Sequence, residues 1–228
     1  MSDVRFILDL FHCGGMAADG YEQAGIIPIG VDIEDHGSPH EVILADAVKA
    51  LSDPLWRPFI EGMDFIHASP PCQAHTRAAH LRKAQGGTSK FEDLLTPTLA
   101  ALREHWYHKP WIVENVPGAP GMDGAITLCG SMFGLKVQRH RLFLSNIQLE
   151  QPTCDHSTFE PDPITGKPRP WGVYHVPKDS IPKGGRTCRN AEHAMECMGV
   201  VRPMKWGELK EGLPPAYTKY LGQQLLAF

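Results

Sequence analysis

Short apolar runs recur through the first half of the chain, and each ends at a polar or glycine-containing stretch. They cover Val4–Phe11, Ile26–Ile33, Val42–Ala47, Met63–Ala68 and Trp111–Val113. Runs of this length, rich in β-branched and aromatic residues, predict buried strands. Helices are predicted between them at Met16–Ala24, closed by Gly25, and at Phe91–His105. Strands that alternate with helices are typical of an α/β fold with a parallel sheet.

The pattern changes after residue 128. Leu128–Leu135 and Val137–Leu144 predict the two arms of a β-hairpin. Arg139 and Arg141 would share one face of the second arm, because side chains two residues apart on a strand point the same way. Two such arginines can clamp a phosphate or a bound base, although a solvated strand edge would give the same pattern. Beyond them, residues 150–185 form a segment rich in proline and glycine. Two further helices are predicted, at Asn190–Met198 and Pro215–Phe228.

The composition is that of a globular protein, with 42% hydrophobic and 21% charged residues in a chain of 228. One domain of ordinary size fits this length. No apolar run is long enough to span a membrane, and the first residues lack the basic start and apolar core of a signal peptide. The six cysteines form no Cys-x-x-Cys pair, so we expect reduced thiols in a cytoplasmic protein.

The net charge of −4 is unevenly distributed. Residues 1–64 carry 12 acidic side chains and 3 lysines or arginines, a balance of −9, whereas residues 65–228 have a balance of +5. Within the second part, the stretch 72–90 contains four basic residues and no acid. The first part could therefore hold a cationic small ligand while the second faces a polyanion, although ordinary solvated surface would also explain each cluster.

The stretch Ala68–Gln73 places a cysteine directly after a predicted strand. Pro70 and Pro71 fix the backbone and end the strand, so Cys72 should lie at its carboxyl end. Ligands bind at that edge of an open α/β sheet, and a thiol there can be a nucleophile once its thiolate is stabilised. A lone cysteine is more often inert. The polar residues at the ends of the other predicted strands favour a nucleophilic role for Cys72.

Three acids, Asp9, Asp32 and Asp46, lie at or near the ends of predicted strands in the N-terminal half. Carboxylates at such ends can bind ribose hydroxyls or an adenine amino group, although each acid alone is more often a helix cap or a loop residue. The glycine turn Phe11–Gly15 would let a ligand approach the backbone at the start of a helix. Together these features predict an adenosine pocket without a phosphate-binding lysine.

Glu114 and Asn115 follow the strand Trp111–Val113 and precede a proline–glycine turn. A carboxyl at this edge can hold or protonate a ring nitrogen and its neighbouring amino group, if burial raises its pKa. A solvated loop acid is the ordinary alternative for Glu114 considered alone. An acid beside the predicted nucleophile, at the same edge of the sheet, favours a catalytic pair.

Four motifs occur in the order found in the DNA cytosine-5 methyltransferases. They are Asp9-Leu10-Phe11 with Gly14-Gly15, Pro71-Cys72-Gln73, Glu114-Asn115-Val116, and Gln138-Arg139-His140-Arg141. The chain resembles compact members of that family from bacteriophages and prophages, over residues 4–149 and more loosely over 186–228. It departs from the family pattern in three places. The first glycine of the glycine loop is absent, Val137 stands where the family has the leading glutamine, and Leu213–Thr218 replaces an asparagine motif.

The resemblance implies a Rossmann-like S-adenosylmethionine-dependent methyltransferase fold. It implies a catalytic core over residues 1–149, a small irregular target-recognition insert over 150–185, and C-terminal helices over 186–228 that complete the core. The activity implied is transfer of a methyl group from S-adenosylmethionine to carbon 5 of cytosine in double-stranded DNA. The target base would be flipped out of the duplex, with the loop 74–90 closing over it.

Residue roles follow from the same resemblance. Cys72 would add to carbon 6 of cytosine, Glu114 would steady the adduct, and Arg139 or Arg141 would engage the base carbonyl and the backbone phosphate. Cofactor contacts are implied for Asp9, Phe11, Gly14, Gly15, Asp32, Ile33, Asp46, Ala47 and Pro70. Substrate contacts are implied for Gln73, Asn115, Val116 and Gln138.

Several alternatives stay open. So small an insert leaves little surface for sequence readout, so RNA or a free cytosine nucleotide could be the substrate. The shortened glycine loop could also mark a relative that binds DNA or cofactor without turnover. Cys154 and His156 with Cys188 or His193 could bind zinc, but the spacing is irregular and we predict no metal. We expect a monomer in the cytoplasm of a bacterial host cell.

Overall fold

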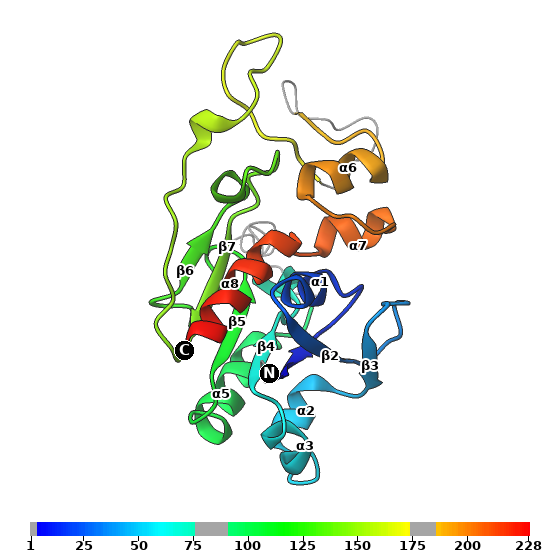
Figure 1. The fold of residues 1–228 in the computed structure, drawn as a ribbon, viewed down its shortest axis with the longest axis vertical. Helices are drawn as coiled ribbons and strands as arrows, with labels where there is room; N and C mark the ends of the chain where they lie inside the picture. The colour runs from blue at the N-terminus through cyan, green and yellow to red at the C-terminus, as the bar shows by residue number, and fades with distance from the viewer. Residues whose placement is uncertain (1–3, 76–90, 174–185) are drawn as a thin grey trace, which may run out of the picture.

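A seven-stranded sheet forms the centre of the molecule (Figure 1), whose computed structural model describes residues 4–75, 91–173 and 186–228. In spatial order the strands are β3 (Glu41–Leu44), β2 (Ile26–Asp32), β1 (Arg5–Leu10), β4 (Phe65–Ala68), β5 (Trp111–Asn115), β7 (Arg141–Ser145) and β6 (Ile126–Leu128). Strands β1 to β5 are parallel, and β7 is antiparallel to both of its neighbours. The strand order runs outward in both directions from β1, so the crevice typical of ligand binding lies at the carboxyl ends of β1 and β4.

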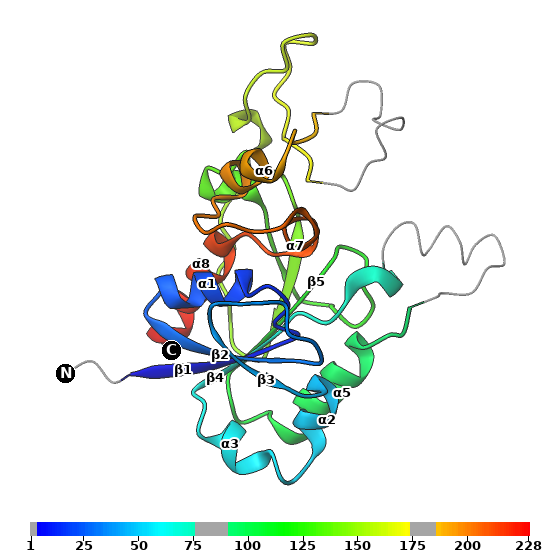
Figure 2. The ribbon, with the colours of Figure 1, turned by 90° about the vertical axis from the view of Figure 1, so that its right-hand side faces the viewer.

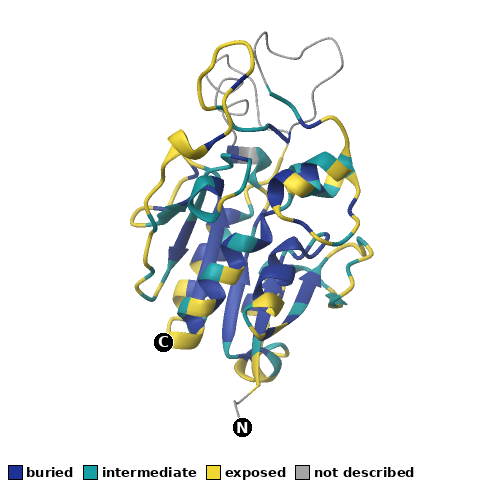
Figure 3. Ribbon diagram, turned by 45° about the horizontal axis from the view of Figure 1, so that its top comes forward, coloured by how far each residue is buried: buried dark blue, intermediate teal, exposed yellow. Residues whose placement is uncertain are grey.

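Helices cover both faces of the sheet: α2 (Ala47–Ser52), α3 (Arg57–Glu61) and α5 (Leu95–His105) on one, α1 (Met16–Gln23) and α8 (Pro215–Ala227) on the other. Because side chains alternate along a strand, Leu8 and Leu10 of β1 pack on the first side and Ile7 packs on the second. Figure 2 shows these two layers, and Figure 3 shows the strands between them as the buried core.

A smaller apolar cluster lies beyond the sheet, around α6 (Ala191–Met198) and α7 (Trp206–Glu211). Val173, from the segment after β7, packs in this cluster with both helices, and Figure 1 shows that segment rising past β6 to reach the level of α6. The predicted caps of α6 are present, since Asn190 accepts a backbone hydrogen bond and Gly199 ends the helix in the left-handed region. The described part of the chain also contains three turns of 3-10 helix: η1 (Cys72–His75), η2 (Gly130–Phe133) and η3 (His156–Thr158).

Most predicted elements are confirmed, and the differences have local causes. Helix α5 begins at Leu95 rather than at Phe91, because the Asp93 carboxylate caps it and Pro97 fits in its first turn. The predicted hairpin is wrong in its first arm: η2 follows β6, and β7 begins only at Arg141. Helices α2, α3 and α7 were not predicted, because five or six residues are too few to show a helical period.

Part of the predicted substrate-closing loop, from residue 76 to 90, lies outside the described residues, as do residues 174–185 of the predicted insert. All six cysteines are within the described ranges, and each is a free thiol. None of the helices in those ranges combines the length and the apolar composition needed to cross a bilayer.

Candidate active site

Cys72 is held at the carboxyl end of β4 by a turn that is fixed from both neighbouring strands. On the β1 side, the N–H of Ser69 donates to the carbonyl of Leu10 at 3.2 Å. On the β5 side, Nδ2 of Asn115 donates to the carbonyl of Pro70 at 3.1 Å. Asn115 is fully buried, so in this structure it positions the turn that presents Cys72.

A cavity of about 930 Å³ runs along the carboxyl ends of the parallel strands. The predicted site residues that line it are Phe11, Gly14, Asp32, Ile33, Asp46, Ala47, Pro70, Cys72, Gln73, Glu114 and Arg141. Its lining is rich in carboxylates, contributed by Asp32, Glu34, Asp46, Glu92, Glu114, Glu208 and Glu211. We call it the acidic cavity. Its charge suits a cationic ligand.

A second cavity, of about 450 Å³, lies on the other side of Cys72. It is lined by Cys72, Val116, Val137, Gln138, Arg139, His140, Arg141, Trp171, Val173 and Lys210. Among the described residues that line it there is no carboxylate, and we call it the basic cavity. Cys72 and Arg141 line both cavities, so the two spaces meet at this pair.

Glu114 and Arg141 form an ion pair beside Cys72. Nε of Arg141 lies 2.9 Å from Oε1 of Glu114, and both side chains are mostly buried. Burial raises the pKa of the Glu114 carboxyl, and the positive charges of Arg141 and Arg139 oppose that shift. Burial and the charge of Glu114 also raise the pKa of the Cys72 thiol, while the same two arginines lower it. In both groups burial raises the pKa and the two arginines lower it, so the thiol and the carboxyl share one electrostatic environment.

Arg139 reaches this site from a turn and not from the predicted strand. Its backbone has a φ of 33°, in the left-handed region that costs energy for a side-chain-bearing residue. Nη2 donates to the carbonyl of Lys210 at 2.7 Å, and the hydroxyl of Tyr217 donates to the carbonyl of Arg139 at 2.9 Å. Loss of hydration and the charge of Arg141 lower the pKa of Arg139 to about 9. Within the described chain its buried Nε has no hydrogen-bond partner.

The glycine turn after β1 adopts a strained form. Phe11 and Cys13 have φ values of 60° and 50°, although neither is glycine. The N–H of Cys13 donates to Oδ2 of Asp32 at 2.8 Å, which ties the turn to the end of β2. Cys13 therefore adopts a glycine-like backbone in a turn that has one glycine fewer than expected. Such strained residues cluster at functional sites.

Three predicted site residues, Asp9, Gly15 and Asn115, line neither cavity. Asp9 is buried beneath the glycine turn, with Oδ2 2.7 Å from Nδ1 of His12, so it supports the turn instead of facing a ligand. Gly15 begins α1 with a φ of 77° and gives the turn its sharp exit. Asp46 does line the acidic cavity, and it also caps α2 by accepting two backbone hydrogen bonds.

Sequence reasoning missed the contribution of the chain around α7. Met204, Glu208, Glu211, Gly212 and Leu213 all line the acidic cavity. Nearby, Arg202 donates to the carbonyl of Gly14 and pairs with Asp19 at 2.9 Å, which fastens the glycine turn to the C-terminal part of the chain. The sequence did contain one local signal for the start of α7, an acid, Glu208, three residues after the N-cap Lys205. In the structure the side chain of Glu208 accepts a hydrogen bond from the N–H of Lys205 at 3.0 Å.

Neither a protein-family model nor a curated protein matches the sequence. Solved structures are similar over the whole length. A DNMT2 mutant from Spodoptera frugiperda superposes with a TM-score of 0.59 at 12% identity, covering 98% of this chain and all of that one. The Dnmt2 methyltransferase of S. pombe gives a TM-score of 0.57 at 14% identity, covering 99% of each chain. The chain has a Rossmann-like methyltransferase fold. In this methyltransferase fold, Cys72 lies where the acidic cavity meets the basic one.

Proposed function

We propose that this protein transfers a methyl group from S-adenosylmethionine to carbon 5 of cytosine in DNA. One observation carries the proposal: Cys72 lies at the junction of the acidic and basic cavities, with Glu114 and Arg141 beside it. A cationic cofactor suits the first cavity, and a base on an anionic backbone suits the second. The two reactants would meet at the thiol that activates one of them.

The acidic cavity fits S-adenosylmethionine in size and chemistry, and when bound the cofactor supplies a methyl group on a positively charged sulfur. Carboxylates of Asp32 and Asp46 would accept from ribose hydroxyls and the adenine amino group. Ile33, which is 72% exposed, and Phe11 offer apolar surface to the adenine ring. The remaining acids of the cavity would face the cationic end.

The residues of the junction suit covalent catalysis. Carbon 5 of cytosine is a poor nucleophile until the Cys72 thiolate forms a bond to carbon 6, which moves ring electrons toward carbon 5. Glu114 would accept from the amino group and protonate the adjacent ring nitrogen, a role that its raised pKa favours. Carbon 5 would take the methyl group as the donor sulfur leaves as a neutral thioether. Solvent water would then accept the proton of carbon 5, the ring nitrogen would return its proton to Glu114, and the Cys72 thiolate would leave carbon 6 to restore the ring.

The basic cavity would receive a cytosine flipped out of the duplex. Arg139 and Arg141 line this cavity, and they would engage the base carbonyl and a phosphate. Trp171 and Val173 also line it, which supports residues 150–185 as the segment that recognises the target. With the core at 1–149 and the helices at 186–228, this would be a compact, phage-like, monomeric enzyme of a bacterial cytoplasm.

A methyl-transfer assay tests the proposal. The purified chain, with S-adenosylmethionine labelled in its methyl group, is offered duplex DNA, RNA and deoxycytidine monophosphate in parallel. We expect label in duplex DNA, and bisulfite sequencing of that DNA should show protected cytosines. Cys72→Ser should give none, while Cys188→Ser, at a buried cysteine that lines neither cavity, should retain activity.

Each other result changes the proposal in a defined way. Label in RNA or in the nucleotide alone would replace DNA as the substrate. Cofactor binding by calorimetry without any transfer would identify a binding protein. Turnover by Cys72→Ser would reject covalent catalysis.

A further inference from the structure

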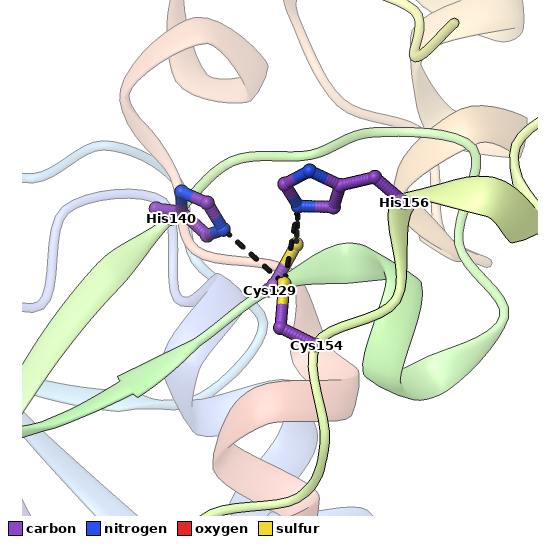
Figure 4. A group of neighbouring side chains, drawn as sticks. All are labelled: Cys129, His140, Cys154 and His156. Carbon is purple, nitrogen blue, oxygen red and sulfur yellow. Dashed lines mark hydrogen bonds between the residues drawn. The ribbon is translucent and has the colours of Figure 1, made fainter. Parts of the chain in front are cut away.

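Two thiols and two imidazoles meet on the β6–β7 side of the sheet (Figure 4), and one of the imidazoles, that of His140, belongs to a residue that lines the basic cavity. Cys129 directly follows β6, and His140 directly precedes β7. Cys154 and His156 come from the segment after β7. One sulfur or ring nitrogen from each residue lies within 4.8 Å of all the others. We call these four residues the Cys2His2 cluster.

The distances within the cluster are those of ligands around one ion. Sγ of Cys154 lies 3.1 Å from Nε2 of His156 and 3.5 Å from Nε2 of His140. Sγ of Cys129 lies 3.5 Å from Nε2 of His156. Tetrahedral zinc, with Zn–N of about 2.0–2.1 Å and Zn–S of about 2.3 Å, sets neighbouring sulfur and nitrogen ligands about 3.5 Å apart. Both histidines also present the same ring nitrogen.

Neighbouring groups are placed to support metal ligands. The hydroxyl of Ser131 donates to Sγ of Cys129 at 3.3 Å and lies 3.6 Å from Sγ of Cys154. Nε2 of the Gln138 carboxamide lies 3.3 Å from Nδ1 of His140. With the carboxamide turned over, its oxygen would accept the Nδ1 proton and leave Nε2 of His140 free for a metal, as in most metal-binding histidines.

We propose that Cys129, His140, Cys154 and His156 bind one structural zinc ion. Two thiolates and two imidazoles are a set that zinc prefers, and two thiolates neutralise its charge. All four positions would be taken by protein, so the ion would be structural and would not bind substrate. The ion would link the segment after β7 to the residues that flank β6 and β7. It would also hold the side chain of His140 in place, and His140 lies between Arg139 and Arg141 in the sequence. This proposal does not depend on the reaction proposed above.

The sequence pointed to a different ligand set and to no metal. Cys154 and His156 were considered with Cys188 or His193, but the structure groups those two with Cys197 at a separate place. The true neighbours of Cys154 flank β6 and β7, and the four donors are unevenly spaced along the chain, so no short spacing motif marks the cluster. Among the described residues, the group of Cys188, His193 and Cys197 has three donors, one fewer than a structural zinc site needs, and it serves below as a control.

Metal analysis of the purified full-length chain, expressed with added zinc, tests the proposal. We expect about one zinc per chain in the wild type and less than about one tenth of that in Cys154→Ser and in His156→Gln. Both side chains are exposed, so the variants should keep the fold, and far-ultraviolet circular dichroism verifies it. Cys188→Ser is the matched control, with zinc unchanged. Cobalt loaded into the wild type should give the visible bands of a tetrahedral site and a sulfur charge-transfer band, both absent in Cys154→Ser.

Stability gives a second measurement. Zinc removal by a chelator should lower the melting temperature of the wild type, and should leave that of Cys154→Ser unchanged, because a ligand bound to the folded state stabilises it. A wild-type chain without zinc even after reconstitution would overturn the proposal. So would zinc retained by folded Cys154→Ser, or zinc lost from folded Cys188→Ser.

Discussion

The acidic and basic cavities meet at one cysteine, yet they are built in different ways. The acidic cavity is formed mainly by chain that directly follows parallel strands, so local patterns in the sequence could point to it. The basic cavity is formed by a turn, the chain before β7, the insert and Lys210, which are far apart in the sequence. The first depends on the general geometry of an α/β sheet. The second depends on contacts specific to this chain, such as that between Arg139 and Lys210.

Their charges differ as well, and Cys72 lies under both influences. Glu114 raises the pKa of its thiol, whereas Arg139 and Arg141 lower it. Burial also raises the pKa of the thiol, so the thiol is largely protonated near neutral pH. The following predictions separate the contributions of the two cavities.

The largest effect is expected from Cys72→Ser. Loss of the nucleophile should lower methyl transfer by at least on the order of 10³-fold. Because the acidic cavity is otherwise unchanged, the dissociation constant for S-adenosylmethionine, measured by calorimetry, should stay within about twofold. A comparable loss of cofactor binding would mean that the two cavities do not act as separate sites.

Glu114→Gln should lower methyl transfer by about 10²–10³-fold, because the amide cannot protonate the ring nitrogen. The same change removes a negative charge beside Cys72 and should lower the pKa of its thiol, so alkylation of Cys72 by iodoacetamide should become faster. Slower methyl transfer together with faster alkylation is expected only if Glu114 acts on the base and not through the thiol alone. Slower alkylation in this variant would contradict the electrostatic picture.

The pH dependence of Cys72 alkylation should show a raised pKa. Followed by mass spectrometry of the Cys72 peptide, the rate should rise about tenfold per pH unit below a midpoint that lies above about 8.5, the value of a free cysteine. Arg139→Met should move the midpoint higher, because it removes a charge that favours the thiolate. A wild-type midpoint below that of free cysteine would show that the arginines outweigh burial and Glu114.

Cys13→Gly should produce the smallest effect, confined to the acidic cavity. At a φ of 50° glycine avoids a cost of about 1–2 kcal/mol, partly offset by its greater entropy when unfolded. We expect the free energy of unfolding to rise by about 0.5 kcal/mol in urea melts. Cys13→Ala, which removes the thiol and keeps the strain, is the control and should give no gain.

Much of the fold could be predicted from the sequence. The five parallel strands, α1, α6 and α8 follow from apolar runs and caps, whose physics is local. The short helices and the first arm of the hairpin were missed, since tertiary packing and not periodicity decides them. Gly130 shows this: a Cβ there would lie 1.8 Å from the carbonyl of Val137, so the chain turns tightly where the pattern suggested a strand.

For the site, the sequence alone determined that Cys72 and Glu114 lie at a common edge of the sheet, because a strand followed by prolines or by an acid fixes where those side chains leave the core. Only the tertiary structure decided that Asp9 lies beneath the glycine turn, that the chain around α7 completes the acidic cavity, and that Arg139 arrives from a strained turn. The same holds for the Cys2His2 cluster. These features need contacts between segments distant in sequence, and no local pattern records which distant segments will pack together.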